Sequence, residues 1–377
     1  MIEAEPSPHA GARTIWDLDT PAPLVDVNRL EANLARMAAV AAASPTARLR
    51  PHVKTHKTRE IASRQLAHGA TGITVAKVGE AEAMVAAGFD DLYIAYPLLG
   101  EQKLSRLLPL LDRARIRFNV ESLPAAEIAS AFFERHGHRV DVCLEMDSAG
   151  RSGLEDPVEA ERLADRIGDL PGLRLVGVMN YGNAYGTSDP EEQARIGTRE
   201  AEFAIGVAET LRRNGHDIRV VTVGSTPTSR HAARVPGVTE LRAGVYAFMD
   251  LKQVSLGGAG TLDDCALTVL TTVVSHARPD KYILDGGLKT FAGENYEWGT
   301  YGRILDRPDI VVTRATEEHG IVIVPDGVPD PGWRIGDRVR VIPNHACGTA
   351  NMHEELIAVD GERVIDRWRV IARGRIR

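Results

Sequence analysis

The sequence is poor in cysteine and lacks any long apolar run. Its 377 residues include three cysteines, Cys143, Cys265 and Cys347, which are too few and too scattered for a disulfide framework. No stretch approaches the roughly 20 apolar residues of a membrane-spanning helix. The opening residues 1–18 are acidic and interrupted by proline, unlike a secretory signal. We therefore expect a soluble protein of the cytoplasm with no membrane partner.

An excess of positive charge is also missing. The net charge is -7, from 45 Lys and Arg against 52 Asp and Glu, and no basic run is interleaved with aromatic residues. Nucleic acid is therefore a poor candidate partner. Hydrophobic residues make up 44% of the chain and charged residues 26%, as in a globular protein with a large core. The length allows one large barrel and a smaller domain.

Short apolar runs alternate with amphipathic helical segments through residues 29–255, which is typical of parallel-strand units. Eight such runs predict a closed (β/α)8 barrel. The first helix has Asn28 and Glu31 in capping-box spacing, which predicts its start. The eight predicted strands are Leu49–Val53, Gly72–Ala76, Asp91–Ala95, Arg115–Val120, Val140–Met146, Leu175–Asn180, Val220–Val223 and Glu240–Tyr246.

After residue 255 the helical periodicity fades and the apolar runs lengthen, so residues 256–377 are predicted to form a β domain. Residues 1–28 are expected to pack on that domain. The fold class is therefore α/β, a (β/α)8 barrel followed by a C-terminal β domain. The predicted strands of the β domain are Ala266–His276, Lys281–Asp285, Ile321–Val324, Arg338–Ile342, Leu356–Val359 and Val364–Val370.

Reactive groups of such barrels lie where the strands end. The first run is followed by Lys54, between His52 and His56, and a lysine there can form a Schiff base if its surroundings lower its pKa. Taken alone, the segment is more typical of a solvated basic loop.

Phosphate-binding chemistry follows the last two runs. Gly224-Ser225-Thr226 and Gly244-Val245-Tyr246 offer amides and hydroxyls where barrels commonly hold phosphate. Because these strands neighbour the first around a closed barrel, a phosphorylated aldehyde cofactor explains both features. Arg151, flanked by glycines, would fix an anionic oxygen, and Tyr181 and Tyr185 follow the sixth run.

A second cluster lies in the β domain, at Pro343 to Glu354. On an extended segment, His345 and Cys347 would project from one face and reach one ion. Imidazole plus thiolate favours zinc, although chance pairing on a strand remains the alternative.

These segments together resemble the D-serine dehydratase and D-threonine aldolase group of alanine-racemase-like pyridoxal-phosphate enzymes. The resemblance spans nearly the whole chain. It is carried by Pro51-His52-Val53-Lys54-Thr55-His56-Lys57, Gly150-Arg151-Ser152-Gly153, Glu240-Leu241-Arg242-Ala243-Gly244-Val245-Tyr246, Asp285-Gly286-Gly287-Leu288-Lys289, Glu318-His319-Gly320, His345-Ala346-Cys347 and Ala372-Arg373-Gly374.

The resemblance implies a homodimer with a catalytic set of Lys54, Arg151 and Tyr181 and a metal at His345 and Cys347. Lys54 would be the Schiff-base lysine. The implied cofactor site comprises His52, Lys54, Arg151, Tyr181, Tyr185, Gly224, Ser225, Thr226, Gly244 and Tyr246.

Two motifs favour the dehydratase branch. Dehydratases tend to carry Gly-Ser-Thr-Pro-Thr and His-x-Cys, as here at 224–228 and 345–347, whereas aldolases tend to carry Gly-Gly-Gly-Thr-Gly and His-x-Asp. We therefore expect conversion of a D-3-hydroxy amino acid to a 2-oxo acid and ammonia, with zinc activating the hydroxyl.

The substrate stays open, and two other functions remain as alternatives to the dehydratase. Tyr181-Gly182-Asn183-Ala184 replaces the usual His-Ala-Gly-His turn, so D-serine, D-threonine and 3-hydroxy-D-aspartate all remain candidate substrates. Retro-aldol cleavage to glycine and an aldehyde, with manganese or magnesium, is the second hypothesis. A non-catalytic pyridoxal-phosphate-binding protein is the third, and the metal-bearing β domain argues against it.

Overall fold

The computed structural model describes residues 11–255, 258–296 and 299–377. The chain divides into two compact units. The barrel unit comprises Leu34–Tyr246, Gly374–Arg377 and the described part of Leu256–Ala259; the β unit comprises the described part of Met1–Asn33, Ala247–Ser255 and Gly260–Arg373. Residues 1–10 and 256–257, on which the predicted N-terminal segment and domain limit partly fall, lie outside the described residues. No described helix is long and apolar enough to cross a membrane.

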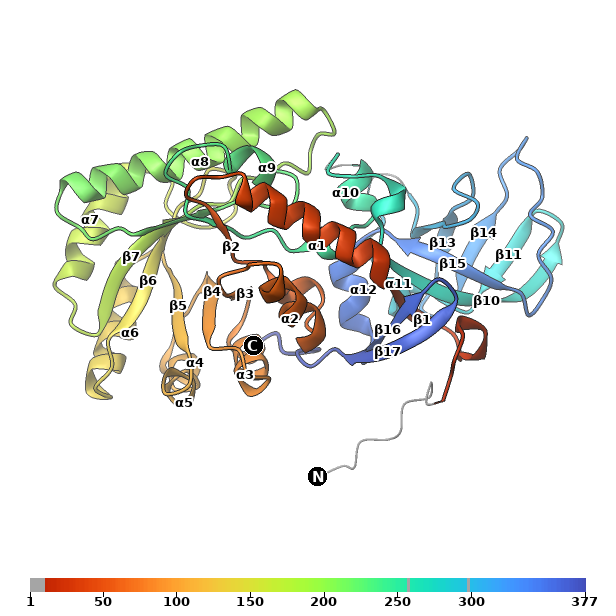
Figure 1. Ribbon diagram of the computed structural model, residues 1–377, viewed down its shortest axis with the longest axis horizontal. Coiled ribbons are helices and arrows are strands. Elements are labelled where there is room, and N and C mark those ends of the chain that lie inside the picture. Colours follow the sequence, from red (N-terminus) through yellow and green to blue (C-terminus); the bar gives the residue numbers. More distant parts are fainter. Residues whose placement is uncertain (1–10, 256–257, 297–298) are drawn as a thin grey trace. The chain divides into compact units, whose positions relative to one another are not determined.

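Eight parallel strands form the core of the barrel unit, in the order β2-β9-β8-β7-β6-β5-β4-β3. The two ends of this order meet, because the amides of Thr71 and Thr74 donate to the carbonyls of Leu49 (2.9 Å) and Pro51 (2.8 Å). The connecting helices lie on the outer side of the strands (Figure 1). The predicted (β/α)8 barrel is confirmed.

The strands of the barrel match the predicted runs closely at most positions. They are β2 (Arg48–Leu49), β3 (Ile73–Val75), β4 (Asp91–Pro97), β5 (Arg115–Val120), β6 (Val140–Glu145), β7 (Leu173–Met179), β8 (Val220–Val223) and β9 (Glu240–Leu241). The helices are α1 (Val27–Ala42), α2 (Arg59–Ala67), α3 (Val78–Ala86), α4 (Glu101–Leu104), α5 (Leu108–Leu111), α6 (Leu123–Arg135), α7 (Pro157–Gly168), α8 (Pro190–Arg213) and α9 (Ser229–Ala232).

Helix ends follow local capping chemistry. Helix α8 begins at Pro190 because Asp189 caps it, its carboxylate accepting from the Glu191 amide (2.9 Å), and proline fits the first turn. Helix α1 begins at Val27, before the predicted capping box. The carboxylate of Asp26 accepts from the amides of Asn28 and Arg29, both at 3.0 Å, so Asp26 replaces Asn28 as the cap.

The β unit is built on a nine-stranded sheet. Its main path runs β13-β14-β11-β10-β1-β16-β17, with β15 pairing both β10 and β12. Sequence reasoning missed β1, β12 and β13. The strands are β1 (Ala22–Asp26), β10 (Leu267–Arg278), β11 (Lys281–Leu284), β12 (Gly302–Ile304), β13 (Val312–Ala315), β14 (Gly320–Ile323), β15 (Arg338–Pro343), β16 (Glu355–Asp360) and β17 (Arg363–Arg369), with helices α10 (Leu251–Ser255), α11 (Leu288–Phe291) and α12 (Ala346–Met352).

The amino ends of the barrel strands hold a buried ion cluster. The Arg50 guanidinium pairs with Asp91 (2.6 Å) and Glu240 (2.8 Å), and Arg117 pairs with the same Glu240. Burial raises the pKa of Glu240, but Arg117 and Arg50 outweigh it and lower the pKa to about 2. A small cavity of about 220 Å³ adjoins this cluster.

Candidate functional site

The carboxyl ends of the barrel strands surround a pocket of about 520 Å³. Almost every residue predicted for the cofactor site lines it. Those residues are His52, Lys54, Arg151, Tyr181, Tyr185, Gly224, Ser225, Thr226 and Gly244.

Lys54 lies in a short 3-10 turn, Val53–Thr55, that follows β2. The turn is capped by His52, whose Nδ1 accepts from the Lys54 amide at 3.4 Å. Burial, and then the charge of Lys54, hold the pKa of His52 well below its usual range. The imidazole is therefore a neutral acceptor that fixes the turn, while the Lys54 side chain reaches into the pocket.

Glycine turns form the part of the pocket at β8 and β9. Gly224 has a φ of +92°, which a residue with a side chain rarely adopts, and its amide donates to Glu200 Oε1 (2.7 Å). A Cβ on Gly244 would lie 2.7 Å from the His52 carbonyl. Since β2, β9 and β8 are adjacent, these turns and Lys54 share one side of the pocket.

Tyr246 is not among the residues that line the pocket. Its amide donates to Thr226 Oγ1 (3.1 Å), and its hydroxyl accepts from Gln65 Nε2 (3.1 Å). Gln65 Oε1 in turn contacts His56 Nε2 at 3.2 Å. Because the Thr58 amide donates to His56 Nδ1, the proton of this imidazole sits on Nε2. A directed chain therefore joins the lysine turn to the β9 turn.

Arg151 lies over the ring of Tyr181, 4.5 Å from its centroid. Its guanidinium also pairs with Glu145 at 3.4 Å. Glu145 accepts from Ser152 Oγ (2.8 Å) and from Asn119 Nδ2 (2.6 Å). The predicted pair of Arg151 and Tyr181 thus stands on a polar layer formed by the ends of β5 and β6.

Sequence reasoning did not assign several other residues that line the pocket, among them Lys77, Tyr96 and Glu121. The Lys77 ammonium lies 3.4 Å from the centroid of the Tyr96 ring. Burial, and then Glu145, raise the pKa of Glu121. Lys77 and Glu121 each follow a predicted strand directly, so the rule that found Lys54 also applies to them.

His345 and Cys347 do not lie on an extended segment, and that prediction is wrong. Residues Ala346–Met352 form helix α12, with His345 as its N-cap. The buried face repeats at Ala346, Thr349 and Ala350, a spacing of three and four that belongs to a helix.

The two side chains nevertheless interact. Burial lowers the pKa of His345, but Cys347 and Glu294 outweigh it and raise the pKa to about 11. The Glu294 carboxylate lies 2.8 Å from His345 Nδ1. Within the described residues, no group of three or more His, Cys, Asp or Glu side chains stands in metal-binding geometry. An imidazole beside a thiol is still a pair of donors suited to a divalent transition metal.

The chain matches two protein-family models. Residues 25–252 match the N-terminal domain of alanine racemase, and residues 266–359 match a putative serine dehydratase domain. Two similar curated proteins are a D-threo-3-hydroxyaspartate dehydratase of Delftia sp. (36% identical, covering 94% of this chain and 98% of the relative) and a D-threonine aldolase of Arthrobacter sp. (36%, 98% and 97%).

Solved structures agree with these matches. The Delftia dehydratase superposes with a TM-score of 0.89 at 36% identity, covering 95% of this chain and 99% of that one. A D-threonine aldolase from Filomicrobium marinum gives 0.88 at 30%, covering 98% and 100%. A cysteine-to-alanine variant of a D-threo-3-hydroxyaspartate dehydratase has been solved in a metal-free form. The chain belongs to the alanine-racemase-like family of pyridoxal-phosphate enzymes, with a C-terminal domain of the serine dehydratase type.

Proposed function

We propose that this protein is a pyridoxal-phosphate- and metal-dependent dehydratase that converts a D-3-hydroxy amino acid to a 2-oxo acid and ammonia. The observation that carries the proposal is the pocket at the carboxyl ends of the barrel strands. It combines Lys54 with the glycine and hydroxyl turns at β8 and β9. Relatives that are 36% identical along nearly their whole length act on substrates of this class.

The pocket suits the cofactor by its donor set. A lysine, a guanidinium and hydroxyl-bearing turns match an aldehyde, a phenolate oxygen and a phosphate. When bound, the cofactor would supply an electron sink for the charge that develops at Cα. Lys54 would carry the Cα proton on Nζ. Arg151 would fix an anionic oxygen from its place over Tyr181.

The metal would be held by His345 and Cys347. In a D-threo-3-hydroxyaspartate dehydratase, a histidine and a cysteine two residues apart have each been replaced by alanine, and the cysteine variant has been solved in a metal-free form. His345 and Cys347 have the same spacing. A thiolate favours zinc over magnesium, and a Lewis acid assists loss of the 3-hydroxyl. Gly-Ser-Thr-Pro-Thr at 224–228 likewise favours the dehydratase branch.

Product analysis tests the reaction. A panel of D- and L-3-hydroxy amino acids, including D-serine, D-threonine and 3-hydroxy-D-aspartate, would be assayed for both 2-oxo acid and aldehyde. We expect oxo acid from D substrates, loss of activity with a chelator and recovery with zinc. The proposal fails if D-threonine yields mainly glycine and aldehyde, or if metal-free enzyme is fully active.

The competing function is the aldolase. It is favoured by the Arthrobacter D-threonine aldolase, whose identity to this chain equals that of the Delftia dehydratase. The homodimer and the cytoplasmic location remain predictions from the sequence.

A further inference from the structure

Glu294 holds one ring nitrogen of His345. Glu294 Oε1 lies 2.8 Å from His345 Nδ1, a distance typical of a charge-assisted hydrogen bond. An imidazole that donates through Nδ1 to a carboxylate presents Nε2 as its ligand atom. The two residues are 51 positions apart in the sequence, so the contact depends on the fold.

The position of Glu294 is fixed by the segment that carries His345. Asn344, which precedes His345, donates from Nδ2 to the Glu294 carbonyl (2.8 Å). Asn344 itself is 1% exposed. The backbone of Glu294 is therefore tied to the segment whose histidine its carboxylate contacts.

A glycine makes room for the carboxylate. A Cβ on Gly348 would lie 2.7 Å from Glu294 Oε2 and 2.8 Å from the Ala292 Cβ, closer than real contacts allow. Glu294 Oε2 is buried and accepts no hydrogen bond from the described residues. Helix α12 thus supplies both the thiol of Cys347 and, one residue later, the gap that admits Glu294.

We propose that Glu294 is the positioning residue of the metal site, and that it directs His345 to bind the metal through Nε2. The inference rests on the proposed metal at His345 and Cys347. A carboxylate on the outer nitrogen of a metal-binding histidine fixes its tautomer and ring orientation and strengthens the ligand, and its loss typically costs about 10–100-fold in metal affinity.

Metal affinity tests the role directly, with Zn²⁺ and Co²⁺ titrated into the metal-stripped full-length chain. We expect Glu294→Ala to raise the Kd for Zn²⁺ by about 10–100-fold. Glu294→Gln should recover part of this loss, because its amide oxygen still accepts from Nδ1. Gly348→Ala should resemble Glu294→Ala. In each variant the Co²⁺ thiolate charge-transfer band should keep its position once the site is saturated.

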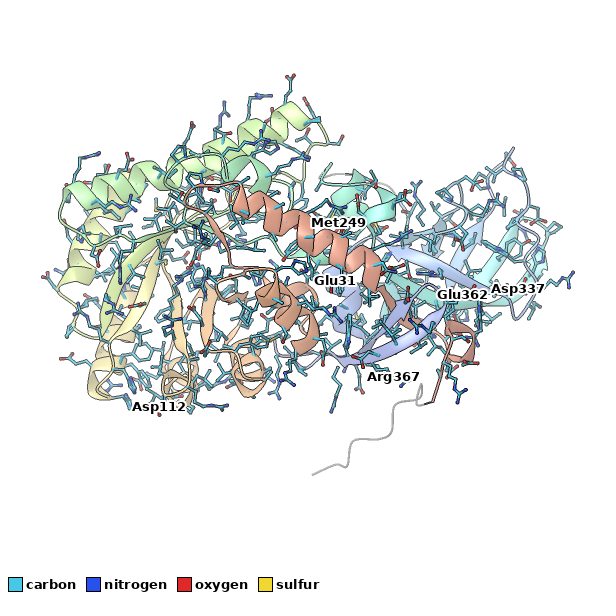
Figure 2. The ribbon with its side chains drawn as sticks, in the orientation of Figure 1. Glu31, Asp112, Met249, Asp337, Glu362 and Arg367 are labelled. Carbon is cyan, nitrogen blue, oxygen red and sulfur yellow. The ribbon has the colours of Figure 1, made fainter. Side chains whose placement is uncertain are left out.

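Glu362→Gln is the matched control. Glu362, labelled in Figure 2, lies in the turn between β16 and β17 and accepts from Trp16 Nε1 (2.9 Å). The Glu362→Gln variant should bind Zn²⁺ with the same affinity as the unaltered protein. Circular dichroism melting curves would show that each variant is folded.

Three outcomes overturn the inference. Unaltered Zn²⁺ affinity in a folded Glu294→Ala variant removes any role of the carboxylate. A loss in Glu294→Gln as large as in Glu294→Ala would make Glu294 a direct ligand instead of a positioning residue. The proposed metal site fails if the unaltered protein binds neither Zn²⁺ nor Co²⁺, or if the Cys347→Ser variant binds these ions as tightly as the unaltered protein. The inference then fails with it.

Discussion

Basic side chains lie at both ends of the barrel, but the groups that they contact differ. At the amino ends of the strands, Arg50 and Arg117 are each paired with buried carboxylates. At the carboxyl ends, Lys77 lies over the ring of Tyr96, and the half-exposed Arg151 lies over that of Tyr181 while making a longer, 3.4 Å contact with Glu145. The same strands supply both ends.

The difference separates stability from binding. Breaking a buried ion pair leaves an uncompensated charge and costs about 3–5 kcal/mol, so the amino end has little freedom to accept a ligand. A cation over a ring is held by about 0.5–2 kcal/mol, so it can turn towards an anion at small cost. We therefore expect substitutions at the amino end to lower stability and substitutions at the carboxyl end to lower turnover.

The largest effect on turnover is expected for Lys54→Ala. Loss of the group proposed to carry the Cα proton should lower kcat by more than about 1000-fold, with little change in melting temperature. Borohydride reduction of the unaltered protein, followed by peptide mapping, should find the cofactor on Lys54. A label on Lys57, Lys77 or Lys289 would refute the assignment, and Lys103→Ala on α4 serves as the control.

At the opposite end, Glu240→Gln should destabilise the fold by about 3–5 kcal/mol, because Arg50 and Arg117 stay buried. Turnover per folded molecule should persist. The pKa of Glu240 is lowered to about 2, so its contribution is complete above the unfolded value near 4.3 and is lost as the pH falls towards 2. Urea unfolding between pH 5 and 2.5 would show this slope in the unaltered protein and a flatter one in the variant. An equal slope in both would contradict the ion cluster.

Arg151→Ala tests the carboxyl end without removing the lysine. A guanidinium half exposed above a ring should contribute only about 0.5–1 kcal/mol to folding, while losing a charge-assisted contact to the ligand should lower kcat/KM by about 10–100-fold. Steady-state kinetics and a melting curve on one preparation would decide. A severe loss of melting temperature with full turnover would show that Arg151 stabilises the fold, as Arg50 and Arg117 do, and does not bind the ligand.

The smallest effect is expected for Tyr246→Phe. Its hydroxyl bonds Gln65 behind the pocket, so the variant should lose about 1 kcal/mol of stability and keep its affinity for pyridoxal phosphate within about twofold. Fluorescence titration of the cofactor-free protein measures that affinity. A tenfold weaker Kd would mean that the hydroxyl reaches the phosphate after all.

Periodicity predicted the barrel because its strands are buried on both faces and therefore form apolar runs. Strand β12 is too short for such a run. Helix α12 was mistaken for a strand because its buried face consists of small residues, Ala346, Thr349 and Ala350, which carry little hydrophobic signal. Glu294 could not be foreseen, since only the fold brings it to His345.

The barrel closes through few bonds, and these lie beneath Lys54. At the closure between β2 and β3, the amides of Thr71 and Thr74 donate to the carbonyls of Leu49 and Pro51, and Pro51 has no amide to donate in return. Regions held by few backbone bonds open first in native-state hydrogen exchange. The amides of Thr71 and Thr74 should therefore exchange before those of the long β6–β7 pair. The barrel would then open transiently at the closure next to Lys54.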